Sequence, residues 1–302
     1  MHLESLKTIL YFSIFNYPLK IEEIHGYTTH QSLQETESEI DYLAKEKIIQ
    51  KIDDYYVYNS DLECVTKRIK GNLGAQKVMA IAKNRANFIS NFPFVKAVGI
   101  SGSLSKGYYD EHSDVDFFVI TEPNRLWITR TFLMLYKKIF LLNSRKYFCI
   151  NYFISTENLE IEEKNRFTAT EIKTLIPIKG RTEFSKFYQE NEWTKKYFKN
   201  HSVDLNTISE NNKPIIIKGL EWFMRMPFWI TLDSCFRKIT LLKWKSKFKT
   251  MEKEDFKIAL KSTRNVSKHH PSNFQKKVIL ALNEKYREFQ KLYNIELSEE
   301  HA

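Results

Sequence analysis

Two carboxylates stand where the sequence otherwise predicts a buried strand. Asp114 and Asp116 belong to the run DVDFFVI, whose other residues are all apolar. Residues two apart in a strand project from the same face, so both carboxylates would lie side by side. Burying two unpaired like charges is costly, whereas a hard divalent cation such as Mg²⁺ binds carboxylate oxygens directly. The pair therefore predicts a metal site with Asp114 and Asp116 as ligands.

A turn that suits phosphate binding precedes the two acids. The apolar run VKAVGIS leads into Gly102 and Ser103. Glycine lets the backbone approach a phosphate closely, while Ser103 and the amides that open the following helix can donate to its oxygens. Lys106, one turn further on, adds positive charge. We expect these three residues to bind nucleotide, together with Ser113, which directly precedes Asp114.

The elements around these residues alternate between helix and strand. Apolar spacing predicts helices over 74–92 and 124–142 and strands over 94–101, 115–121 and 145–155. The strand over 115–121 is apolar on both faces, which predicts a central place in its sheet. Buried strands that alternate with helices indicate an α/β fold with helices packed against the sheet. The carboxylates would then stand on a rigid element.

The two-part pattern resembles a known family. A strand that ends in Gly-Ser, a ten-residue spacer over 104–113 and then Asp-Val-Asp in an apolar strand are similar to the nucleotidyltransferase superfamily, which includes DNA polymerase β, kanamycin nucleotidyltransferase and MNT-type proteins. The resemblance covers about residues 74–155. It implies a mixed α/β (α+β) sheet with flanking helices, and transfer of a nucleoside monophosphate from a nucleoside triphosphate with Mg²⁺ or Mn²⁺. Segments 167–193 and 269–278 also resemble bacterial nucleotidyltransferase-domain proteins, whose substrates remain unnamed.

The sequence departs from the family at its third carboxylate. In the family a later strand normally supplies an acid, and the inward position of the corresponding strand here is Asn151. An amide oxygen can bind a metal, but asparagine cannot act as a base at neutral pH. Glu157 or Glu171 could replace the acid, although each is expected to be a solvated residue. Two functions stay open: a transferase acting on a hydroxyl of an unknown acceptor, and a catalytically impaired nucleotide-binding or regulatory module.

The N-terminal residues predict a separate module over 1–66. Helical spacing at Ile40, Leu43 and Ile48 is followed by two short β-prone runs, and the order of three helices and a hairpin resembles a winged helix. Residues 1–60 hold 5 Lys and Arg against 10 Asp and Glu, a net charge of −5. Such a charge repels nucleic acid phosphates, so DNA binding is not expected, and protein contact or internal packing is favoured.

The C-terminal residues predict a basic helical domain over 161–302, after a nucleotidyltransferase domain over 67–160. Residues 213–302 hold 19 Lys and Arg against 10 Asp and Glu, a net charge of +9. An aromatic cluster is expected to form its core: Trp222, Phe223, Phe228, Trp229 and Trp244. The neighbouring lysines predict either a solvated face or a surface for RNA or another polyanion. His269 and His270 are interpreted as a helix boundary, and His112 as a loop residue.

Composition sets the remaining expectations. The chain has 302 residues, 42% hydrophobic, which favours a folded protein over disorder. Three widely separated cysteines indicate neither a disulfide framework nor a zinc site. We find no signal peptide and no membrane-spanning run, because charges interrupt the longest apolar stretches. A cytoplasmic protein without membrane contact is expected.

Overall fold

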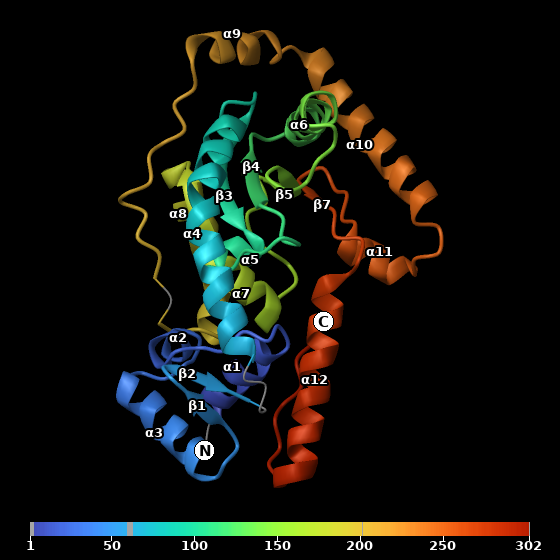
Figure 1. Ribbon diagram of the computed structural model, residues 1–302. Coiled ribbons are helices and arrows are strands. Elements are labelled where there is room, and N and C mark those ends of the chain that lie inside the picture. The colour runs from blue at the N-terminus through green and yellow to red at the C-terminus, as the bar shows by residue number, and fades with distance from the viewer. Residues whose placement is uncertain (1–2, 59–62, 201, 302) are drawn as a thin grey trace.

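The N-terminal region of the computed structural model, which describes residues 3–58, 63–200 and 202–301, contains three helices followed by a hairpin. These elements are α1 (Glu4–Ser13), α2 (Ile21–Gly26), α3 (Leu33–Lys45), β1 (Gln50–Ile52) and β2 (Tyr55–Val57). The order agrees with the sequence analysis, while the winged-helix assignment itself stays a prediction. We call these elements the N-terminal module; they lie at the bottom of Figure 1.

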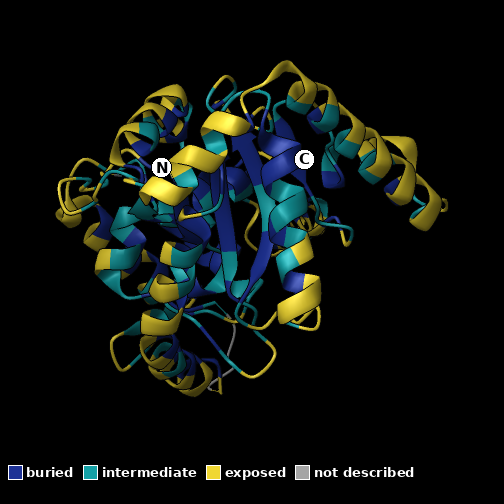
Figure 2. Ribbon diagram, turned by 90° about the horizontal axis from the view of Figure 1, so that it is seen from above, coloured by how far each residue is buried: buried dark blue, intermediate teal, exposed yellow. Residues whose placement is uncertain are grey.

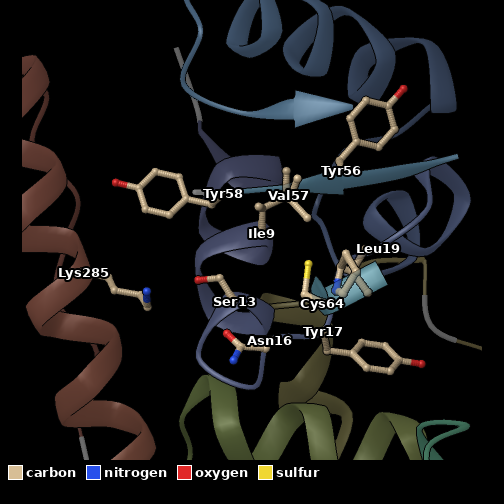
Figure 3. Close-up of a pocket in the computed structure, with 11 residues that line it drawn as sticks. Ile9, Ser13, Asn16, Tyr17, Leu19, Tyr56, Val57, Tyr58, Cys64 and Lys285 are labelled. Carbon is tan, nitrogen blue, oxygen red and sulfur yellow. The ribbon is translucent and has the colours of Figure 1, made fainter. Parts of the chain in front are cut away.

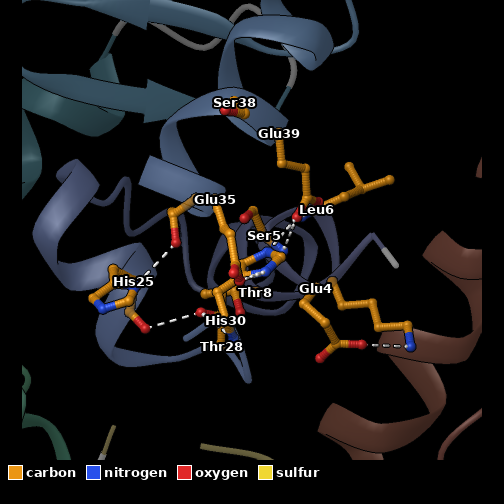
Figure 4. A network of polar contacts seen from close by, with 12 residues as sticks. Glu4, Ser5, Leu6, Thr8, His25, Thr28, His30, Glu35, Ser38 and Glu39 are labelled. Atoms are coloured by element: carbon orange, nitrogen blue, oxygen red, sulfur yellow. Dashed lines mark hydrogen bonds and ion pairs between the residues drawn. The ribbon is translucent and has the colours of Figure 1, made fainter. Parts of the chain in front are cut away.

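Local signals explain why α3 forms and how it is oriented. The Ser32 hydroxyl accepts a hydrogen bond from the backbone N–H of Glu35 and so caps the first turn. Ile40 and Leu43 are buried against α1, as their spacing predicted. Glu39 also points inward, and its carboxylate accepts hydrogen bonds from the first turn of α1 (Figure 4). Glu39, one of the acids that give residues 1–60 their negative charge, is therefore a packing residue and not a surface charge.

A mixed sheet forms the centre of the molecule. In the described part of the chain its five strands run in the order β6-β3-β4-β5-β7, with β4 and β5 parallel and the other neighbours antiparallel. The strands are β3 (Val95–Ser101), β4 (Asp116–Thr121), β5 (Cys149–Ser155), β6 (Ile176–Lys179) and β7 (Val266–Lys268). Figure 2 shows them as a buried layer between helices. The central place predicted for the strand that holds Phe117–Ile120 is confirmed.

Helices cover both faces of the sheet. On one face, Val98, Phe117 and Val119 pack against α4 and α6, and on the other, Phe118 and Ile120 pack against α7 and α8. The covering helices are α4 (Glu63–Ser90), α6 (Leu126–Phe140), α7 (Arg166–Thr174) and α8 (Arg181–Glu190). Short elements follow the strands and helices: α5 (Gly102–Ser105), a 3₁₀ turn (Glu192–Lys196) and α11 (Lys253–Ala259). The mixed α/β fold with flanking helices is thus observed.

The sheet does not respect the predicted domain boundaries. Strands β6 and β7 come from residues assigned to the helical domain over 161–302, so the boundary at residue 160 is wrong for the sheet. Helix α4 likewise runs unbroken across the boundary at residue 66. The last helix, α12 (Phe274–Tyr293), packs through Leu282 and Phe289 against the N-terminal module. The N-terminal module and α12 therefore belong to one structure, because their apolar faces are buried against each other.

The expected aromatic core of the C-terminal domain is wrong. Helices α9 (Ile215–Phe223) and α10 (Pro227–Lys247) form an arm that crosses the molecule beside α6 (Figure 1). On this arm the Trp222 side chain is 75% exposed and Phe228 is 67% exposed, whereas Trp244 is buried against Trp127. In the described residues no helix is long and apolar enough to span a membrane.

Candidate functional site

A cavity of about 590 Å³ opens on the α7 face of the sheet, where β4 begins. Three regions of the chain line it, and each contributes a different chemistry. The sheet and its turn give polar residues: Ser101, Gly102, Ser103, Lys106, Asp116 and Asn151. The N-terminal module and α7 give Phe12, Phe15, Tyr17, Phe167 and Glu171. The C-terminal segment gives Lys268, His270, Asn273, Phe274 and Gln275.

Gly102 occupies a position that only glycine can fill. Its φ is +71°, in the left-handed region, and a Cβ there would lie 2.4 Å from Oδ2 of Asp116. The preceding Ser101 is the register partner of Asp116, so the end of β3 brings the turn beside this carboxylate. The sequence pattern of Gly-Ser and Asp-x-Asp is thereby brought together in space.

Asp116 is a partly buried carboxylate whose surroundings disfavour its charge, although the positive charge of Lys106 opposes this effect. Burial raises its pKa to about 6, a hydrogen bond from Cys149 opposes this shift, and the charges of Asp114 and Glu171 add to it. Asp114 lies just before β4 rather than inside it, which corrects the expected strand boundary. Val115 between them continues the pairing with β5 and is buried on the opposite face. The alternation keeps both carboxylates on one side, although Asp114 does not line the cavity.

Asn151 lies beside Asp116, where the third acid was sought. Its Nδ2 donates to Oδ1 of Asp116 at 3.1 Å, and the same amide lies 3.1 Å from Sγ of Cys149. The register of β4 with β5 shifts at this point, so that Asn151 has no partner residue on β4. Such a bulge re-aims side chains, and here it turns Asn151 toward Asp116. The predicted proximity of Asn151 to the acids is confirmed, whereas its catalytic role is untested.

The two glutamates considered as substitutes separate clearly. Glu171 on α7 lines the cavity, and its Oε1 accepts from Lys106 Nζ at 2.7 Å. Lys106 also donates to the carbonyl of Gly102 at 3.0 Å, which holds its charge over the turn. Glu157 is exposed beyond the end of β5, whereas Asp116 lies beside the first residue of that strand. Glu157 as a substitute is therefore wrong, and so is the expectation that Glu171 is merely solvated.

Ser113 and His112 belong to the loop before the carboxylates. The Ser113 hydroxyl donates to Oδ1 of Asp110 at 2.7 Å and accepts from its backbone N–H at 3.1 Å. Asp110 lines the cavity, but Ser113 does not. His112 is an exposed loop residue, as expected. A nucleotide contact by Ser113 stays a prediction.

The residues present fit a divalent metal. Asp114 and Asp116 offer hard oxygen ligands, Asn151 offers an amide oxygen if it rotates, and the raised pKa of Asp116 indicates that its surroundings compensate the charge only in part. Among the described residues no three His, Cys, Asp or Glu side chains gather as a ligand set. Mg²⁺ commonly binds through one or two carboxylates and takes its other ligands from water and substrate phosphates. The pair of aspartates suits that mode.

Several lining residues escaped the sequence analysis. Phe12 lies in α1 and Phe15 just after it, in an apolar stretch that gives no sign of a site, and Lys268 lies in a strand of three residues, too short for a periodic signal. His270 was noticed only as part of a helix boundary, which is confirmed because it lies between β7 and α12. Burial lowers its pKa to about 4, so its imidazole is neutral at pH 7. A pairing between distant segments brings these residues to the cavity.

A second, smaller cavity lies within the N-terminal module. It has a volume of about 130 Å³ and lies between α1, the hairpin and α12, with Ser13, Tyr58 and Lys285 on its walls (Figure 3). Its lining residues include no acid. This cavity lacks the paired carboxylates and the glycine turn of the first, which is therefore the candidate site.

Comparison with known proteins agrees with this choice. Residues 81–221 match the family model of the nucleotidyltransferase domain. No curated protein and no solved structure matches the chain significantly. The matched region contains the turn, both aspartates, Asn151 and Glu171, but neither the N-terminal module nor the segment from β7 to α12. The lining residues from the N-terminal module and from the C-terminal segment thus lie outside the family match.

Proposed function

We propose that this protein transfers a nucleoside monophosphate from a nucleoside triphosphate to a hydroxyl group of an acceptor, because residues 81–221 match the family model of the nucleotidyltransferase domain. The observation that carries the proposal is the contact between turn and carboxylate. The Gly102 backbone lies against the Asp116 carboxylate, which is partly buried and whose charge is compensated only in part. A metal-bound triphosphate would satisfy both groups at once.

The residues of the turn would hold the phosphates. Ser103 and the backbone amides near Gly102 can donate to phosphate oxygens, and Lys106 adds a cation that is already fixed over the turn. Asp114 and Asp116 would hold Mg²⁺ or Mn²⁺. The metal, when bound, neutralises the charge that develops on the phosphates and aligns them for in-line displacement.

Removal of the proton from the acceptor hydroxyl requires a base, and Glu171 is the carboxylate of the cavity that suits this role. Asn151 cannot accept a proton, and Asp110 is engaged by Ser113 and Tyr108. Glu171 lines the same cavity, and its charge affects Asp116. We assign Glu171 the role of general base, which requires Lys106 to shift from Glu171 toward the phosphates.

A second function follows from Asn151. An amide where the family places an acid would weaken the metal site, and it leaves the protein able to bind nucleotide without turnover. In that case the protein would act as a nucleotide-binding regulatory module, with the N-terminal module contacting a partner.

Label transfer separates the two functions. Purified protein is incubated with each α-³²P-labelled nucleoside triphosphate, with Mg²⁺ or Mn²⁺, and with a lysate that supplies acceptors. A transferase labels an acceptor in a metal-dependent way, and the Asp116→Asn variant does not. Metal-dependent nucleotide binding by calorimetry without label transfer would favour the regulatory module, and absence of both would contradict the site.

A further inference from the structure

The far end of the cavity lies across the sheet from the carboxylates. Lys268 on β7 is the register partner of Tyr152 on β5, which in turn pairs with Phe118 on β4. Neighbouring strands lie about 4.8 Å apart, so this lysine stands roughly 10 Å across the sheet from β4. Asn273 and Gln275, at the start of α12, line the same end. This end is outside the family match.

Two buried amides at this end have donors without partners. Asn273 is 8% exposed and Gln275 is 5% exposed, and within the described structure neither Asn273 Nδ2 nor Gln275 Nε2 has a hydrogen-bond partner. Oε1 of Gln275 accepts from Lys268 Nζ at 3.1 Å, which fixes the orientation of that amide with its NH₂ group free. A buried donor left unpaired costs about 1–3 kcal/mol, so such groups normally have a partner.

The beginning of α12 adds positive potential. Asn273 is its N-cap residue, in a left-handed conformation with φ of +44°, and its side chain makes no capping bond in the described structure. The first N–H groups of a helix of 20 residues lack intrahelical partners and favour an anion. Among the described residues, the acids that line the cavity are Asp110, Asp116 and Glu171, none of them on β7 or α12.

Lys268 completes a cluster of donors. It is buried, and burial lowers its pKa, while Glu163 at 3.9 Å opposes the shift. Glu163 also lies 3.6 Å from Lys261, so it is shared between two lysines. An anion beside Lys268 would favour its charged form. Lys268, the two amide donors without partners and the N-terminus of α12 all supply hydrogen-bond donors or positive potential, which an oxyanion would satisfy.

The geometry of attack at the phosphorus indicates which substrate carries this oxyanion. In an in-line displacement, the attacking oxygen and the leaving group lie on opposite sides of the phosphorus. Gly102, Ser103 and Lys106 lie on the β3 side of Asp116 and would hold the pyrophosphate. The attacking hydroxyl then comes from the β5 and β7 side, where Lys268 and Gln275 lie.

We propose that the end of the cavity formed by Lys268, Asn273 and Gln275 binds a carboxylate or phosphate group of the acceptor, a small molecule whose hydroxyl group receives the nucleotide. The inference rests on the proposed function. The acceptor oxygen forms a bond to the α-phosphorus, the bond to the β-phosphate breaks, pyrophosphate leaves, and the hydroxyl proton passes through water to Glu171, which lines the same cavity. Phe15, Phe167 and Phe274, with ring centroids 6.0–6.2 Å apart in adjacent pairs, form an apolar wall for the rest of the acceptor.

Binding of small hydroxyl compounds, without nucleotide, tests the subsite. Glycerol 3-phosphate and glycerate carry the two oxyanions, and glycerol is the neutral counterpart. Calorimetry should detect binding of at least one oxyanion compound and not of glycerol. Lys268→Met and Gln275→Leu should each weaken this binding at least 10-fold. Lys276→Gln is the matched control, because Lys276 lies on the same turn of α12 but pairs with Asp255 at 2.7 Å and does not line the cavity.

The same variants separate this inference from the proposed function. Asp116→Asn should abolish metal-dependent nucleotide binding and leave oxyanion binding intact, whereas Lys268→Met should do the reverse. If Lys268→Met loses nucleotide binding instead, or if a non-hydrolysable nucleoside triphosphate with Mg²⁺ displaces the oxyanion, this end holds the triphosphate and the inference is wrong. Absence of oxyanion binding at millimolar concentration also overturns it. If the wild type binds the oxyanion but does not bind nucleotide, only the proposed function is overturned.

Discussion

Two carboxylates, one buried in the N-terminal module and one partly buried at the cavity, have opposite surroundings. Glu39 accepts hydrogen bonds from the backbone N–H groups of Ser5 and Leu6, both at 3.1 Å, and from Nε2 of His30 at 2.7 Å (Figure 4). Asp116 accepts hydrogen bonds from the Asn151 amide and the Cys149 thiol, while two further acids disfavour its charge and Lys106 favours it. The fold satisfies Glu39 through three donors, whereas it compensates the charge of Asp116 only in part.

Asp233 extends the comparison. It is 3% exposed, and Oδ1 accepts from the backbone N–H of Ile128 at 2.8 Å, in the first turn of α6. Like Glu39, it stabilises the start of a helix. Among the described residues, these two buried acids each complete a helix, whereas the partly buried Asp116 faces a cavity. The unsatisfied acid identifies the site more sharply than burial does.

The largest effect should follow removal of the charge at Asp116. Asp116→Asn keeps the side-chain size but removes a metal-ligand charge, so nucleotidyl transfer should fall by about 10²–10³-fold, equivalent to several kcal/mol of transition-state stabilisation. Asp114→Asn should act in the same direction. Label transfer and calorimetry with Mg²⁺ and nucleotide measure the change. Unchanged nucleotide affinity in both variants would refute the metal site.

Glu39→Gln should instead lower stability and leave the chemistry intact. Hydrogen bonds to a charged group contribute about 1.5–3 kcal/mol, and an amide cannot accept from all three donors. We expect a free energy of unfolding lower by about 2 kcal/mol in urea titration. Glu35→Gln on the same helix is the control, because Glu35 is half exposed, and it should change stability by less than about 0.5 kcal/mol. Equal effects of the two variants would contradict the structural role of Glu39.

The pH dependence of stability should distinguish the two kinds of carboxylate. The raised pKa of Asp116, about 6, lies above its value in the unfolded chain, so without metal the folded protein holds a proton that the unfolded chain has lost. This contribution is complete below about pH 4 and is lost as pH rises through 6. In EDTA, wild type should therefore lose about 1–3 kcal/mol of unfolding free energy relative to Asp116→Asn between these values. A constant difference would show that Asp116 is not desolvated.

Asn151→Asp should move the site toward the family pattern. A third carboxylate beside Asp116 would tighten divalent-metal binding by about 10-fold, if each ligand charge contributes about 1.4 kcal/mol. Calorimetry with Mn²⁺ measures it. If transfer activity falls although metal binding tightens, the amide of Asn151 orients a substrate. If neither changes, Asn151 does not face the metal.

The smallest effect concerns the basic arm. Exposed lysines on α10, among them Lys243, Lys245 and Lys247, support the proposal of a polyanion surface. Replacing these three by glutamine should weaken binding of poly(U) RNA and reduce the slope of log affinity against log salt by about 2, because each contact to single strands adds about 0.7. Fluorescence anisotropy at several salt concentrations measures this. An unchanged slope would leave the lysines as a solvated face.

Local patterns predicted the centre of the molecule well. The strands around Gly102 and Asp116, the helix over 126–140 and the place of Asn151 follow from apolar periodicity and from the spacing of a known motif. These features lie close together in sequence, so local residues suffice to define them.

The errors come from long-range packing. Lys268 reaches the cavity because β7 pairs with β5, more than a hundred residues earlier in the chain, and nothing in a three-residue run announces its partner. Trp222 and Phe228 were expected in a core because large aromatic side chains are usually buried. They remain exposed because the arm passes over α6 with one side only against the protein. Whether an apolar residue is covered depends on where its helix is placed.

The position of β7 has a consequence for biosynthesis. This strand and the start of α12 cover the outer edge of β5 and complete the cavity, yet they are synthesised more than a hundred residues after β5. Until then β5 is an edge strand with unpaired backbone groups, which invites pairing with other nascent chains. The cavity is completed and the exposed sheet edge is covered in the same step of translation.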